Sequence, residues 1–305
     1  MRLILHRVTV VRGTKSGVYS RHKMKNSTLF VAAIAGAGFI YAMLRAGETS
    51  STLDLAVARF PLSSELSSLH DDVIQYSSDI HASFDEKSPL STYALANIHY
   101  TAILCHRGVR TLCEEGWTVL SSVLIRTMLD HIVNCIAITA VPARANFMAF
   151  KYFAPLPMKL ATDSVMTATE RKDAMELLKN FVGRLPAKDQ PEAEAFIKNY
   201  KPTAYWYSPE FQRPRDVLKQ ASVPLASMYS MFSGPAHGGF SLQVLFNDHS
   251  AVQDINPREY PQWSKRAIEA SSRLLLEIGR ARCVWDDLGH EEEYEQLQQR
   301  IGALK

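Results

Sequence analysis

The sequence predicts an all-α protein, and three observations support this fold class. Apolar residues recur at the three- and four-residue spacing of helix faces through most of the chain after residue 60. Gly, Pro and capping residues divide that part into segments of helical length. No stretch shows a convincing set of alternating strands or a repeated strand–helix–strand unit. We therefore expect a bundle of about eight helices.

Composition and charge indicate which broad classes of protein the chain can belong to. The chain has 305 residues, 47% of them hydrophobic and 21% charged, which is ordinary for a globular protein. Its four cysteines form no CxxC pair, which disfavours a Cys-rich zinc site and suits a reducing compartment. Residues 1–47 hold eight Lys and Arg and no acid, so the remainder is mildly acidic. A mildly acidic domain is poorly suited to bind nucleic acid, because nucleic-acid-binding proteins usually present a basic surface.

The first 48 residues predict a basic N-terminal region that precedes a helical domain at residues 49–305. Within it, residues 26–44 contain no charge, and this segment is about long enough to span a bilayer. The alternatives are a membrane anchor, a secretory signal if translation starts at Met24, or a buried helix of a soluble protein. The reduced cysteines favour a cytoplasmic location, with membrane contact through residues 26–44 as the alternative.

Helix boundaries in the domain follow from prolines, glycines and caps. Pro142 is expected to close a central helix, Pro155 and Pro157 to end the next one, and Gly234-Pro235 to end a later one, with Pro224 as an interruption. Segments 165–184 and 188–200 are amphipathic and charged, which predicts surface helices. The expected helices are 63–84, 93–112, 117–141, 144–153, 165–184, 188–200, 215–233, 262–287 and 290–304.

The segment 117–141 is the most informative one. It is apolar nearly all the way round, which predicts a central, buried helix. Arg126, Asp130 and Asn134 follow one another at four-residue steps and form a narrow polar stripe on it. A buried Arg and Asp cost several kcal/mol unless they are paired and hydrogen-bonded. The stripe therefore predicts a polar site in which Arg126 binds an anionic group or fixes Asp130.

A second motif is Tyr229-x3-Ser233-x3-His237, followed by Gly238-Gly239. A His flanked by glycines is held in a turn that another group can approach closely. The alternative is a His that merely satisfies a buried turn. We predict Arg126, Asp130 and His237 as candidate catalytic groups. The candidate binding residues are Asn134, Tyr229 and Ser233.

The two motifs together resemble a bacterial, all-helical domain family of unknown function. That family carries an Arg-x3-acid pair inside an apolar helix and Tyr-x3-Ser-x3-His some 100 residues later. The match covers about residues 65–285, and Asp130 stands where the family more often has Glu. The resemblance implies that Arg126, Asp130 and His237 meet in one pocket, and it implies no activity.

The segment from Arg126 to His131 also fits Arg-x4-His, and so resembles the HEPN superfamily of helical proteins. Some HEPN members are metal-independent ribonucleases of toxin and defence systems that act as dimers. The resemblance implies an RNA partner, a homodimer and catalysis by Arg126 and His131. Helical geometry opposes this, because His131 lies about 140° from Arg126 around the helix, on an apolar stripe where a packed His is more common.

Other signals are weak. His70, Asp71, Asp72, His99 and His106 are the residue types of helical metal sites, but their spacing does not fit. No P-loop, GxSxG or dinucleotide fingerprint occurs in the sequence, so we expect no metal and no cofactor. The aromatic triplet at residues 205–207 would stack a base or pin a loop to the core.

Three functions remain open from sequence. The leading one is a binding or regulatory protein with an unknown ligand at the polar stripe. The second is a HEPN-like ribonuclease. In the third, the stripe is an ion-pair network that only specifies packing.

Overall fold

The structure, a computed structural model, describes residues 61–82, 88–115, 120–200, 206–207, 213–221, 223–236 and 261–304. Over these ranges the predicted all-α class is confirmed, because they contain helices and no strand. The basic N-terminal region with residues 26–44 lies outside the described residues, as does His237.

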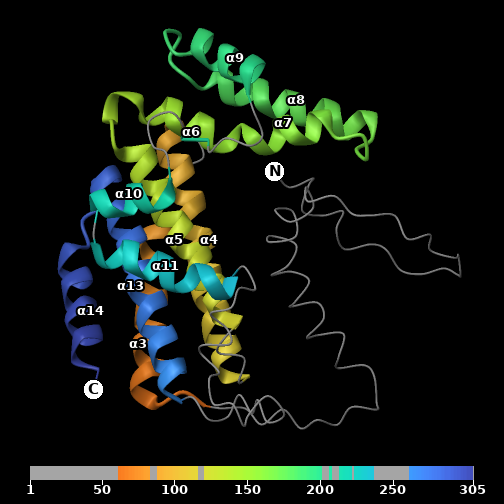
Figure 1. Cartoon of the computed structure of the whole chain (residues 1–305). Coiled ribbons are helices and arrows are strands. Elements are labelled where there is room, and N and C mark those ends of the chain that lie inside the picture. The colour runs from red at the N-terminus through yellow and green to blue at the C-terminus, as the bar shows by residue number, and fades with distance from the viewer. Residues whose placement is uncertain are drawn as a thin grey trace, which may run out of the picture. The chain divides into compact units, whose positions relative to one another are not determined.

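Four helices form the centre of the bundle (Figure 1). They are α3 (Ser64–Ala82), α4 (Leu90–Glu114), α5 (Ser121–Thr139) and α13 (Pro261–Asp286). α5 packs against both α4 and α13, which also pack against each other, and α3 packs on α13 and α4. The apolar surface of α5 explains this central position. It completely buries Ile125, Met128, Leu129 and Ile138.

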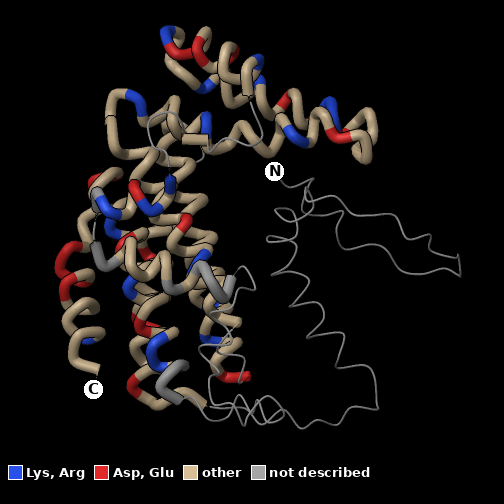
Figure 2. Tube along the Cα trace, in the orientation of Figure 1, with Lys and Arg blue, Asp and Glu red and all other residues tan. Residues whose placement is uncertain are grey.

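The helices that follow α5 cover one end of this core. The short 3-10 turn η4 (Pro142–Arg144) leads into α6 (Ala145–Phe153), which packs on α4 and α5. α7 (Pro155–Thr162) packs on α8 (Ala168–Gly183), and α9 (Gln190–Asn199) contacts α6 and α8. Figure 2 shows acidic and basic residues intermixed along α8 and α9, whereas α5 is almost uncharged. This fits the predicted surface position of the two charged segments.

The last helices pack on the sides of the core. α10 (Pro214–Ala221) and α11 (Val223–Ala236) both pack on α5 and on each other. α14 (Glu291–Ala303) packs on α13 and α3. α11 therefore covers the central helix, and this contact creates the candidate site.

One predicted helix end is confirmed and one is wrong. α6 ends at Phe153, just before Pro155, as predicted, and the two prolines then lie in the first turn of a new helix, α7, where a proline needs no hydrogen-bonded N–H. Gly234-Pro235 does not end α11, which continues to Ala236. A proline clashes with the Cβ of the residue before it, and Gly234 has none. α5 begins at Ser121 rather than at 117, and residues 117–119 lie outside the description.

Uncharged histidines line the packed faces of the core. The rings of His70 and His106 stack with centroids 4.3 Å apart, and His106 Nδ1 lies 2.8 Å from the Ser271 hydroxyl oxygen. His99 is fully buried, and burial lowers its pKa to about 3. Burial also lowers the pKa of His131 to about 4. These rings are neutral at physiological pH, so the fold excludes their protonated forms.

We expect acid to destabilise the protein by protonating these rings. The unfolded chain has ordinary His pKa values of about 6.5, so below that pH it binds more protons than the folded state. The stabilisation that comes from keeping these rings neutral is fully present above about pH 6.5. It is lost progressively as the pH drops toward the pKa values of the folded state. His99 and His131 should each contribute about 1.4 kcal/mol per pH unit. Urea unfolding between about pH 8 and about pH 5 measures this slope.

His99→Gln should reduce the slope of the unfolding free energy against pH by nearly the contribution of one proton, about 1.4 kcal/mol per pH unit. Val165→Gln, which changes an exposed side chain without a titratable group, is the control and should leave the slope unchanged. A stability that stays constant from about pH 7.5 to about pH 5 would contradict the assignment of neutral buried rings.

Candidate functional site

Arg126 and Asp130 form an ion pair on α5. Arg126 Nη1 lies 2.5 Å from Asp130 Oδ1, as expected for side chains four residues apart on a helix. The two partners differ in exposure, because the Arg126 side chain is 12% exposed and the Asp130 side chain is 47% exposed. The predicted pair therefore lies at the edge of the core, with the carboxylate toward solvent.

Tyr229 brings α11 to the same arginine. Arg126 Nη2 donates a hydrogen bond to the Tyr229 hydroxyl, and the guanidinium carbon lies 3.6 Å from the centroid of the Tyr229 ring. A guanidinium over an aromatic face adds a cation–π attraction to the hydrogen bond. Arg126 thus connects two helices that are about 100 residues apart in sequence. The backbone of Ser233 lies one turn further along α11, while His237 is outside the description.

Asn134 has its own aromatic partner at the other end of the stripe. The Trp206 indole N–H donates to Asn134 Oδ1 at 3.1 Å. The Trp206 ring meets Tyr152 edge-on with centroids 5.6 Å apart, and burial raises the pKa of Tyr152. Of the two roles open for the aromatic triplet, the structure has Trp206 fixed against the core. No spacing pattern connects Trp206 with Asn134, since the two residues are 72 positions apart.

The three polar residues of α5 and their two aromatic partners form one elongated site, which we call the α5–α11 seam. It consists of Arg126, Asp130, Asn134, Tyr229 and Trp206. Eight residues of helix separate its ends, or about 12 Å. The carboxylate of Asp130 lies between a tyrosine end and a tryptophan end. This arrangement offers a fixed hydrogen-bond acceptor flanked by two aromatic side chains.

His131 does not join this site. It is buried, and neither of its ring nitrogens has a hydrogen-bond partner among the described residues. With its pKa lowered to about 4 by burial, it is a poor proton donor at neutral pH. The described geometry therefore adds no support for joint catalysis by Arg126 and His131, and the ribonuclease function stays a prediction.

The described residues contain no cluster of metal-ligating side chains. No group of three or more His, Cys, Asp and Glu among them is placed to hold a metal ion. α5 is the one described helix that is long and apolar enough to cross a membrane, and most of that apolar stretch is buried in the bundle.

Comparison with known proteins returned no match: no family model, no curated protein and no solved structure matches the chain. The two resemblances inferred from the motifs therefore remain predictions. What the site does has to be inferred from its geometry.

Removal of Arg126 should destabilise the protein more than removal of Asp130. Arg126→Ala deletes a mostly buried side chain with partners on two helices, which should cost about 2–3 kcal/mol of unfolding free energy. Asp130→Ala deletes a half-exposed partner and should cost about 1 kcal/mol or less. Urea unfolding measures both. Arg144→Ala, which breaks the exposed pair with Glu192, is the control for an ordinary surface ion pair. Equal losses for Arg126→Ala and Asp130→Ala would contradict the described asymmetry.

Proposed function

We propose that this chain is a helical ligand-binding protein whose recognition site is the α5–α11 seam. The observation that supports this proposal most directly is the unequal exposure of the Arg126–Asp130 pair. Arg126 is engaged by Asp130 and Tyr229, so its role is to fix the carboxylate. Asp130 keeps nearly half of its side chain exposed to solvent, so a ligand can approach the carboxylate.

A second ion pair, within α13, can be compared with the Arg126–Asp130 pair of the seam. Arg282 and Asp286 are also four residues apart, but their side chains are only 1% and 11% exposed. Asp286 additionally accepts a hydrogen bond from Thr92 at 2.7 Å. Both charges of that pair are enclosed by the core, as expected of an ion pair with a packing role. The pair at the seam instead leaves one partner open, which favours recognition over packing alone.

The chemistry of the seam indicates the class of ligand. Two roles were open for Arg126, to bind an anion or to fix Asp130, and its contacts favour the second. A ligand for the exposed Asp130 carboxylate carries an amine or another hydrogen-bond donor. Tyr229 and Trp206 lie on either side, so a ligand about as long as the seam would reach both helices. Binding across α5 and α11 would also change how firmly α11 is held, which gives the protein a regulatory response.

A thermal-shift screen of amine-bearing small molecules tests the proposal. A ligand of the seam should raise the melting temperature of the wild-type protein in a concentration-dependent way. Asp130→Asn keeps the shape of the side chain and removes its charge, so affinity should fall by about tenfold or more. Glu192→Gln removes an exposed carboxylate that pairs with Arg144 away from the seam, and it should bind as the wild type does.

Two outcomes would contradict binding at the seam. Ligands that stabilise wild type and Asp130→Asn equally bind elsewhere, and a screen in which no donor-bearing compound binds leaves the packing role as the better explanation. RNA cleavage by a dimer that His131→Ala abolishes would instead support the ribonuclease.

A further inference from the structure

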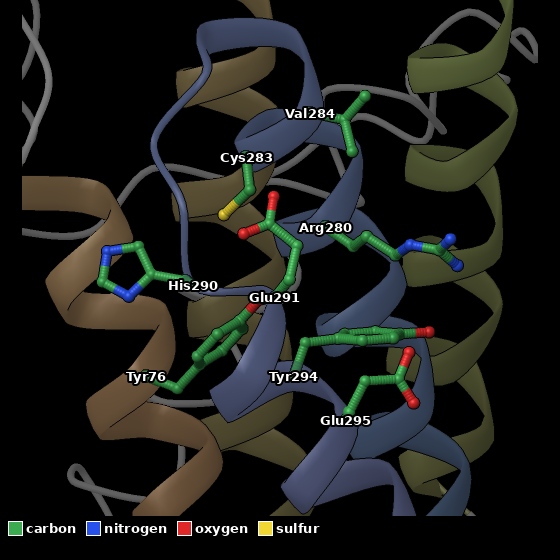
Figure 3. Close-up of a pocket in the computed structure, with 8 residues that line it drawn as sticks. All are labelled: Tyr76, Arg280, Cys283, Val284, His290, Glu291, Tyr294 and Glu295. Carbon is green, nitrogen blue, oxygen red and sulfur yellow. The ribbon is translucent and has the colours of Figure 1, made fainter.

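A separate pocket lies where α3, α13 and the start of α14 meet (Figure 3). Its volume is about 80 Å³. Tyr76 comes from α3, Cys283 from α13, and Tyr294 from α14. Drug-sized ligands need pockets of roughly 300 Å³ or more, so this one suits a group of only a few non-hydrogen atoms.

An unusual turn places the first residues of α14 over this pocket. Asp287, Gly289 and His290 all have positive φ angles, of 52°, 76° and 75°. Such angles are uncommon for residues with a Cβ and are kept where the surrounding structure enforces them. The turn brings His290 and Glu291 against the end of α13, and both line the pocket.

The innermost wall of the pocket contains a buried polar group, the Tyr76 hydroxyl, whose hydrogen-bonding capacity is not satisfied by any described residue. The Tyr76 side chain is 95% buried, since the residue is only 5% exposed. Its hydroxyl is near the Cys283 thiol but has no hydrogen-bond partner among the described residues. Figure 3 shows this hydroxyl directed toward the space below Cys283 and Glu291. A ligand with an N–H donor would satisfy the hydroxyl oxygen.

The electrostatic field in the pocket is unfavourable for negative charge. Burial raises the pKa of Tyr76, and the neighbouring Cys283, Tyr294 and Glu293 raise it further. Burial likewise raises the pKa of Cys283, with a contribution from Glu291. Burial disfavours a charge of either sign, whereas the contributions of Glu293 at Tyr76 and of Glu291 at Cys283 come from negative charge and favour a cation beside these carboxylates.

The outer wall already stabilises one cation. The guanidinium carbon of Arg280 lies 5.1 Å from the centroid of the Tyr294 ring. A hydrogen bond with Tyr294 raises the pKa of Arg280, and Glu277 and Glu295 add to this effect. In Figure 3 the Arg280 guanidinium points away from Cys283 and Tyr76. The inner part of the pocket therefore remains open beside a wall that suits positive charge.

We propose that this pocket binds a primary ammonium group, from a small free amine or from a lysine side chain of a partner. The N–H donors of an ammonium match the carboxylate of Glu291 and the hydroxyl oxygen of Tyr76, which lie on the same side of the pocket in Figure 3. The attached methylene groups fit against the two tyrosine rings, where a cation is also attracted by the aromatic face. The site is separate from the α5–α11 seam and does not depend on its function.

Saturation-transfer NMR on the full chain tests this with three probes of similar size: ethylammonium, ethanol and acetate. Ethylammonium should bind with a dissociation constant in the millimolar range, as expected for so small a ligand. Ethanol and acetate should give no saturable signal. Equal binding of either of them would overturn the proposal, because charge would then not determine binding.

Two variants in the first turn of α14 complete the test. Glu291→Gln removes a carboxylate that lines the pocket and should weaken ethylammonium binding by about fivefold or more. Glu292→Gln changes the exposed neighbour, which does not line the pocket, and should have no effect. Identical affinities for the two variants would overturn the proposal. A lysine-containing tripeptide that binds more tightly than ethylammonium identifies a partner's side chain as the source, and the reverse order identifies a free amine.

Discussion

The structure depends on satisfying the polar side chains that lie on an otherwise apolar central helix. α5 must be buried because nearly all of its surface is apolar, yet Arg126 and Asn134 lose hydrogen bonds to water when it is. The chain supplies replacements from two distant places, Tyr229 on α11 and Trp206 in the segment before α10. The position of α11 on the core follows from this requirement as much as from its apolar contacts.

The protein treats charge differently at the seam and inside the core. In the core, His99 and His106 are neutral because burial lowers their pKa values, and Arg282 is enclosed together with Asp286. At the seam one charge is shielded and its partner remains accessible. Charged groups in the core are thus neutralised or enclosed in pairs, whereas the seam keeps a carboxylate exposed. This difference is consistent with ligand recognition at the seam. The pocket beside α14 is a second place where carboxylates remain open to solvent, and there too the available chemistry favours a positively charged group.

Much of the fold could be predicted from the sequence, since helix periodicity and four-residue spacing are local properties. They gave the central helix, the stripe and the pairing of Arg126 with Asp130. The contact of Asn134 with Trp206 is tertiary, and no spacing rule connects those positions. The exposure of Asp130 depends on what covers α5, which a helical projection does not contain. The pocket at α14 depends on positive φ angles at Asp287 and His290, residues whose types do not require them.

The most direct test of this account is amide hydrogen exchange along α11 in Arg126→Met, compared with Asp130→Ala. If Arg126 holds α11 on α5, Arg126→Met should speed exchange in α11 by about tenfold or more while α4 and α13 keep their protection. Asp130→Ala should leave α11 nearly as protected as in the wild type, since Tyr229 keeps its donor. Unchanged protection of α11 in Arg126→Met would contradict the account, because the helix would then be held by its apolar contacts alone.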